Sequence, residues 1–151
     1  MPSHYHTWLS LAPKHRIGNQ IAVTRSILLV DDDDDMRTAL TQFLADEGFA
    51  VHTARNGREA LTRLGEIEPP GLILLDLMMP VMDGSQFLAE RRSDPRLSRI
   101  PVVIMSAWTR DWRGDSVGVE AVVTKPIRPE QLVTLVARYC DRDSAEDPST
   151  R

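Results

Sequence analysis

The sequence has 151 residues, 42% of them hydrophobic, and its 18 basic and 22 acidic side chains give a net charge of −4. This length and composition suit one globular domain with some additional chain and exclude wholesale disorder. The acidic balance disfavours nucleic acid and anionic membranes as partners, and no apolar run is long enough to span a bilayer. The single cysteine, Cys140, allows no intrachain disulfide, which is typical of a reduced, cytoplasmic setting.

Short apolar runs alternate with amphipathic segments along most of the chain. The apolar runs predict five strands, at Ser26–Val30, Ala50–Thr53, Gly71–Leu75, Val102–Ser106 and Ala121–Thr124. The other segments predict helices at Asp35–Glu47, Gly57–Leu64, Ser85–Arg92 and from Pro129 onward. A further segment, 111–118, is a poor helix because it contains two glycines. We expect residues 1–25 to be an extension, 26–140 the domain, and 141–151 a polar tail.

The first predicted helix follows a run of five aspartates, Asp31 to Asp35. Asp34 is the expected N-cap, and Gly48 is the expected stop. The apolar face would consist of Met36, Leu40, Phe43 and Leu44. For Asp34 and Asp35 an acidic helix N-terminus is a sufficient explanation, because the helix dipole favours negative charge there.

Strands that alternate with helices predict a parallel α/β sheet with right-handed crossovers. Such sheets bind ligands at the carboxyl ends of their strands. The polar residues at those ends are Asp31, Asp32, Asp76, Ser106 and Lys125. We therefore expect these five residues, which are far apart in the sequence, to meet at one edge of the sheet.

Three converging carboxylates would raise one another's pKa values, and a small divalent cation removes that conflict. Mg²⁺ prefers a few carboxylates with waters and often shares its sphere with a phosphate. A hydroxyl from Ser106 and an ammonium from Lys125 complete a site suited to phosphoryl transfer. Asp76 is the expected nucleophile because it stands alone at its strand end, whereas Asp31 and Asp32 form a pair suited to holding the metal.

The chain resembles the receiver domains of response regulators in two-component signalling. The resemblance covers about residues 26–140 and rests on five stretches in a fixed order, which are specific together although each is weak alone. The stretches are Ile27–Asp32, Ala54–Leu61, Leu74–Gly84, Pro101–Ala107 and Val123–Ile127. It implies a flavodoxin-like, doubly wound sheet of five parallel strands in the order 2-1-3-4-5.

The resemblance also implies roles at the site. Asp76 would accept the phosphoryl group. Asp32 would bind Mg²⁺ together with Asp76 and the backbone carbonyl of Met78, while Asp31 would act largely through a water. Lys125 would pair with a phosphoryl oxygen. Ser106 and Ala107 would bind the phosphoryl group and transmit the switch signal. The adjoining loops would be shaped by Pro80, Gly84 and Pro126.

The implied partners are proteins. A sensor histidine kinase or a histidine phosphotransfer protein would donate the phosphoryl group, and an unidentified downstream protein would read the phosphorylated state. The domain would catalyse only its own phosphorylation and dephosphorylation. We expect a monomer or weak homodimer that does not itself bind nucleic acid or membranes, because no residues remain for a DNA-binding domain.

Two departures from the family pattern stand out. The position that often holds an aromatic residue, three before the lysine, holds Val122, and the span from Ser106 to Lys125 is shorter than usual. We expect a short or irregular fourth helix in 111–118. Trp108, two residues after Ser106, would shield the acyl phosphate from water, or it would simply pack or form a partner surface.

Three alternatives stay open. Val122 and the shortened span are compatible with a docking module that works without phosphorylation. A phosphatase with an aspartyl-phosphate intermediate would need a second acid two residues after the nucleophile, where this chain has Met78. The chain is also compatible with a receiver fragment of a longer kinase or regulator, with the two ends as linkers.

Overall fold

A computed structural model describes residues 14–17, 20–23, 25–107 and 118–140 of the chain. Its central sheet consists of β3 (Ile27–Val30), β4 (Val51–Ala54), β5 (Leu72–Asp76), β6 (Val102–Ser106) and β7 (Val119–Thr124). All neighbouring strands in this sheet are parallel, and they lie in the order β4-β3-β5-β6-β7. Numbered within the sheet this is 2-1-3-4-5, which confirms the predicted flavodoxin-like topology.

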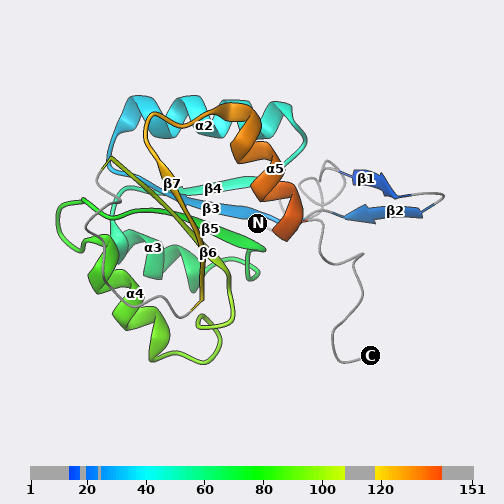
Figure 1. Ribbon diagram of the computed structural model, residues 1–151. Coiled ribbons are helices and arrows are strands. Elements are labelled where there is room, and N and C mark those ends of the chain that lie inside the picture. Colours follow the sequence, from blue (N-terminus) through cyan, green and yellow to red (C-terminus); the bar gives the residue numbers. More distant parts are fainter. Residues whose placement is uncertain (1–13, 18–19, 24, 108–117, 141–151) are drawn as a thin grey trace.

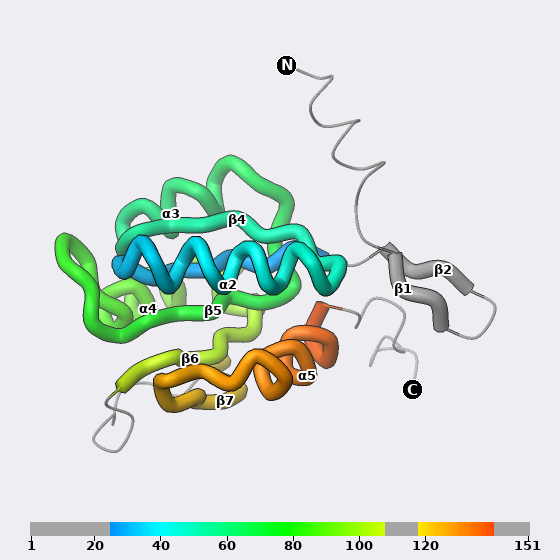
Figure 2. The backbone as a smooth tube through the Cα atoms, turned by 90° about the horizontal axis from the view of Figure 1, so that it is seen from above, coloured from blue at the N-terminus to red at the C-terminus, as the bar shows by residue number. Residues whose placement is uncertain are grey.

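Helices cover both faces of this sheet (Figure 1). The helices of the described residues are α2 (Asp34–Asp46), α3 (Gly57–Leu64), α4 (Gly84–Arg92) and α5 (Pro129–Cys140). α2 and α5 lie on one face, and α3 and α4 lie on the other (Figures 1 and 2). None of these helices, within the residues that the structure describes, is long and apolar enough to cross a membrane.

The core consists of two apolar layers, one on each face of the sheet. Because successive strand residues point to opposite faces, each buried strand contributes to both layers. On the α3/α4 side lie Leu28, Val30, Ile73, Leu75, Val102 and Ile104 with Ala60, Leu64, Phe87 and Leu88. On the α2/α5 side lie Ile27, Leu29, Leu72, Leu74, Val103 and Met105 with Leu40, Leu44, Leu132 and Val136. Packing in these two layers holds the strands in place, and therefore also the edge of the sheet at which the polar residues lie.

The start of α2 differs from the prediction. Asp33, and not Asp34, is the N-cap: its backbone is extended and its carboxylate accepts a hydrogen bond from the Met36 amide at 3.1 Å. Because five consecutive residues are aspartates, the sequence does not show which of them is the N-cap. The predicted stop is confirmed, because Gly48 has φ 99° and its amide donates to the Ala45 carbonyl.

β7 begins two residues earlier than the apolar run suggested. Glu120 is an extra residue between the pairs Val102–Val119 and Val103–Ala121, so the alternation of side chains is interrupted there. The strand therefore extends through a position that reads as polar in the sequence.

Two short strands that the sequence did not predict lie in the N-terminal stretch. β1 (Lys14–Ile17) and β2 (Gln20–Val23) pair as an antiparallel two-stranded sheet. The expected irregular fourth helix, at 111–118, lies outside the described residues except for residue 118. Trp108 and the expected tail at 141–151 also lie outside them.

Candidate functional site

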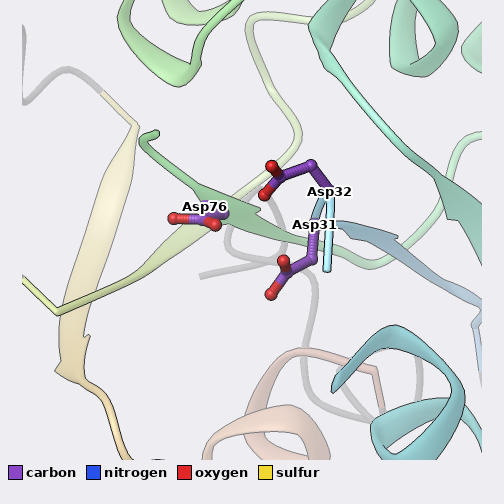
Figure 3. A group of neighbouring side chains, drawn as sticks. All are labelled: Asp31, Asp32 and Asp76. Carbon is purple, nitrogen blue, oxygen red and sulfur yellow. The ribbon is translucent and has the colours of Figure 1, made fainter. Parts of the chain in front are cut away.

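The carboxyl ends of the central strands place the predicted polar residues along one edge of the sheet. Asp31 and Asp32 follow β3 directly, and Asp76 is the last residue of β5. Since β3 and β5 are neighbours, their ends lie side by side, and the three carboxylates approach one another (Figure 3). One oxygen from each of these carboxylates lies within 4.8 Å of the others.

Asp31 is fully buried, and both of its carboxylate oxygens accept hydrogen bonds. One accepts from the amide of Asp33 at 2.9 Å, and the other accepts from the ammonium of Lys125 at 3.0 Å. The Asp31 amide donates to the Ala54 carbonyl at 3.1 Å. A carboxylate removed from water is tolerated only with such partners, so Asp31 is a fixed component of the site.

Lys125 bridges the two buried aspartates. Its ammonium lies 3.0 Å from Asp31 and 3.3 Å from Asp76, and its side chain is 19% exposed. Burial alone would lower the pKa of Lys125, but the hydrogen bond and charge of Asp31, together with Asp76, outweigh it and raise the pKa. Lys125 is therefore a positively charged side chain that its two carboxylate partners hold in place at this edge of the sheet.

Asp76 is almost as buried as Asp31, with 5% of its surface exposed. Burial is the main reason that its pKa is raised, and the neighbouring charge of Asp31 acts in the same direction. Lys125 and the amide of Met78 lower the pKa of Asp76 without cancelling this rise. The Met78 amide lies 3.3 Å from the Asp76 carboxylate oxygen that Lys125 does not contact. Lys125 lies nearer to Asp31 than to Asp76, which leaves Asp76 as the less compensated carboxylate of the buried pair.

Asp32 is the exposed member of the acidic cluster. Its carboxylate faces the same space as those of Asp31 and Asp76 (Figure 3). Three hard oxygen donors, one of them open to water, form the type of donor set that Mg²⁺ binds through one or two carboxylates and several waters. The residues therefore fit a magnesium ion, and a single lysine leaves the three carboxylates with a net negative charge.

The loop after Asp76 is tightly built. Gly84 packs so closely that a Cβ atom there would lie 2.7 Å from the Asp76 carbonyl oxygen, and its amide donates to the Leu77 carbonyl at 2.9 Å. The Met82 amide donates to the Pro80 carbonyl at 2.7 Å, which closes a three-residue turn around Val81. Pro80 lies in the loop after β5, and Gly84 is the first residue of α4, where that loop ends.

The loop also contacts the beginning of α3. The amide of Gly57 donates to the Met82 carbonyl at 2.8 Å. The side chain of Asn56 caps α3 by accepting from the Glu59 amide at 2.8 Å, and Asp83 and Gln86 form a reciprocal capping box at the start of α4. The Asp83 cap fixes the end of the loop at α4, and the Asn56 cap fixes the start of α3, which the loop contacts.

The remaining predicted residues lie along the same edge. Ser106 ends β6 and is 1% exposed, whereas the neighbouring Ala107 is exposed. The backbone carbonyl of Ser106 accepts from the amide of Lys125 at 2.9 Å, so the two strand ends are directly joined. Pro126 follows Lys125 through a cis peptide bond. The contacts described here bring Asp31, Asp32, Asp76 and Lys125 together, and Ser106 is connected to them through the backbone.

One charged neighbour of the site was not singled out from the sequence. Arg37, on α2, donates to the backbone carbonyl of Asp31 at 2.8 Å and pairs with the carboxylate of Asp34. The only signal in the sequence is a basic residue two positions after an acidic run, a pattern that also occurs on solvated helices.

Comparisons with known proteins agree with this geometry. Residues 27–137 match the family model described as the response regulator receiver domain. A 14.6 kDa protein from Leptolyngbya boryana is 37% identical over 80% of this chain and 94% of its own length. The response regulator Rre1 of Synechocystis is 38% identical over 80% of this chain, which spans about half, 53%, of that regulator.

Solved structures show the same fold. The chemotaxis protein CheY4 of Vibrio cholerae has a TM-score of 0.71 and 30% identity, covering 78% of this chain and 99% of CheY4. The response regulator TrrA of Thermotoga maritima, solved in complex with Mg²⁺ and BeF, has a TM-score of 0.66 and 28% identity over 76% of this chain and 98% of TrrA. With its family match, its parallel five-stranded sheet and its acidic edge, this chain belongs to the response regulator receiver family of two-component signalling.

Proposed function

We propose that this receiver is a phosphorylation switch in which Asp76 accepts a phosphoryl group in a Mg²⁺-dependent reaction. The donor is a histidine kinase or a histidine phosphotransfer protein, and the phosphorylated form changes its affinity for a partner protein. The observation that supports this is the convergence of Asp31, Asp32 and Asp76, with Lys125 between the two buried acids. Receiver domains are signalling modules and not conventional enzymes, so the reaction is limited to the domain's own acyl phosphate.

In the transfer, a carboxylate oxygen of Asp76 attacks the phosphorus of the donor's phosphohistidine. The new P–O bond forms as the P–N bond breaks, and the imidazole leaves with its electron pair and takes up a proton. A bound Mg²⁺ supplies positive charge to the phosphoryl oxygens. The raised pKa of Asp76 reflects a carboxylate that burial leaves under-compensated, and a bound cation would relieve this.

The other residues of the site have separate roles in this proposal. Asp32, which is exposed, would hold the metal together with Asp76 and the backbone carbonyl of Met78. Asp31, whose two oxygens accept hydrogen bonds from the Asp33 amide and Lys125, would act largely through a water, as the family resemblance implies. Lys125 moves from the Asp76 carboxylate to a phosphoryl oxygen, and Ser106 with Ala107 receives another and passes on the switch signal. The functional unit is residues 26–140, flanked by an N-terminal extension and a C-terminal tail.

Intact-mass spectrometry tests the proposal. The full chain, incubated with acetyl phosphate and MgCl₂, should gain one phosphoryl group, and the gain should disappear with excess EDTA. Asp76→Ala should gain none, whereas Asp46→Ala, at an exposed α2 position, should be labelled like the unmodified chain. If the unmodified chain stays unlabelled under conditions that label an ordinary receiver, the switch is wrong and the phosphorylation-independent docking module is favoured.

A further inference from the structure

Arg37 lies on the first turns of α2, next to the acidic cluster. Its side chain is mostly buried, with 15% exposed, although α2 is a surface helix (Figure 1). One guanidinium nitrogen donates to the backbone carbonyl of Asp31 at 2.8 Å, and the other pairs with Asp34. An arginine can hold two such partners at once because its donors form a rigid, planar fork.

The carbonyl that Arg37 contacts belongs to a residue held from several directions. The Asp31 amide donates to Ala54, its carboxylate accepts from Asp33 and Lys125, and its carbonyl accepts from Arg37. The backbone between Asp31 and Asp33 carries Asp32, whose carboxylate is the exposed member of the cluster. The direction of the Asp32 side chain therefore depends on a short turn that has Arg37 as one of its supports.

We propose that Arg37 is a positioning residue for the cation site. Through the Asp31 carbonyl, it holds the backbone turn that directs Asp32 toward Asp76. The inference rests on the proposed Mg²⁺ site and adds to it a residue that does not itself touch the metal. Supports of this kind commonly change metal affinity roughly ten- to a hundredfold when they are removed.

A purely electrostatic role for Arg37 would have the opposite sign. A cation beside three carboxylates repels Mg²⁺, so deleting its charge should strengthen metal binding. A positioning role requires that deletion weaken binding, because the released turn lets the carboxylate of Asp32 move away from its partners. The sign of the change in metal affinity distinguishes the two roles.

Isothermal titration of MgCl₂ into the full chain tests this. Arg37→Met keeps a long apolar stem and loses both hydrogen bonds, and it should bind Mg²⁺ about tenfold more weakly than the unmodified chain. Arg37→Lys keeps one donor and the charge, and it should lie between the two. Equal or tighter binding by Arg37→Met would overturn the positioning role.

A measurement without metal separates positioning from global stability. Hydrogen exchange in EDTA should be faster in Arg37→Met at the Asp33 amide, which donates to Asp31, and unchanged in β3 at Ile27–Val30. Faster exchange throughout the sheet would mean that Arg37 only stabilises the fold, which also contradicts the inference. If the unmodified chain binds no Mg²⁺, the proposed metal site itself fails; if it binds but the variants match it, only the role of Arg37 fails.

Discussion

The five consecutive aspartates occupy different environments. Asp31 is buried between Lys125 and the Asp33 amide, and Asp32 is exposed beside Asp76. Asp33 caps α2, and Asp34 pairs with Arg37, while Asp35 lies in the acidic first turn of the helix. The chain accommodates this charge because each carboxylate except Asp32 has a cation, an amide or a helix N-terminus near it. The remaining charge is what a divalent cation would neutralise.

Replacing Asp76 should stabilise the metal-free protein. Its pKa in the folded chain is raised above 3.8. The contribution of Asp76 to the stability of the fold is therefore fully present below pH 3.8 and is lost as the pH rises through the folded-state pKa. Asp76→Asn should therefore unfold at higher urea concentration than the unmodified chain at pH 7 in EDTA. The difference should shrink toward pH 4.

The control is Glu68→Gln, an exposed acid on the surface. It should leave the free energy of unfolding nearly unchanged at both pH values. If Asp76→Asn proves no more stable than the unmodified chain at pH 7, burial of Asp76 is not costly and the reasoning from its raised pKa is wrong.

Val81 should also be replaceable with a gain in stability. It has φ 69°, a left-handed conformation that is strained for a β-branched residue, and its side chain is 79% exposed. Val81→Asn should raise the free energy of unfolding by about 1 kcal/mol, because Asn tolerates this conformation better. Urea unfolding at pH 7 measures the change.

Val122→Asn is a matched control, because that valine is also exposed but lies in β7. There the same substitution should lower stability, since asparagine is unfavourable in strands. Equal effects at the two positions would show that backbone strain at Val81 contributes nothing.

At the scale of elements, the sequence predicted most of the framework. Short apolar runs located all five strands of the central sheet, and the predicted helix Gly57–Leu64 agrees with α3 in both bounds. The strand order came from the family resemblance, because apolar runs do not specify which strands are neighbours. The ends of α2 and β7 differed where identical aspartates or an extra residue concealed the boundary.

Some side-chain contacts could not be predicted. Arg91 is 1% exposed, although a charged residue on a helix normally faces water. Its guanidinium donates to the carbonyls of Ser98 and Ile100, and the sequence gives no sign of this contact. At the site, residue types and strand ends indicated Asp31, Asp32, Asp76 and Lys125, but the second cation, Arg37, required the structure.

The contact between α3 and the loop after Asp76 should be sensitive to one methyl group. A Cβ atom on Gly57 would lie 2.7 Å from the Met82 Cγ and 2.9 Å from the Met82 carbonyl oxygen, which accepts the Gly57 hydrogen bond. Gly57→Ala should therefore destabilise the chain by about 1–3 kcal/mol in urea unfolding, despite the better helix propensity of alanine.

Gly65 provides the comparison at the other end of the same helix. A Cβ atom there has no neighbour closer than 3.4 Å, and its backbone is right-handed helical. Gly65→Ala should be neutral or should stabilise the chain by up to about 1 kcal/mol. If Gly57→Ala instead stabilises the chain, the loop after Asp76 shifts easily enough to accommodate the added methyl group, and the predicted clash with Met82 is wrong.

At the scale of the whole molecule, the two apolar layers leave the carboxyl edge of the sheet as the place where the buried polar residues Asp31, Asp76 and Ser106 gather. A ligand that binds only the folded chain raises its stability, by about 2.7 kcal/mol at a hundredfold excess over the dissociation constant. Mg²⁺ should therefore raise the unfolding temperature of the unmodified chain in a concentration-dependent manner. Asp32→Asn should greatly reduce this shift, whereas Asp35→Asn, in the first turn of α2, should retain it.

The most direct test of the central claim is to locate the phosphoryl group. Borohydride reduces an acyl phosphate on aspartate to homoserine, which peptide mass spectrometry can place at a single residue. After treatment with acetyl phosphate and Mg²⁺, we predict homoserine at residue 76, and none at residues 31 or 32 or in EDTA. Conversion at either of those two aspartates, or at residue 76 equally well without a divalent cation, would contradict the account.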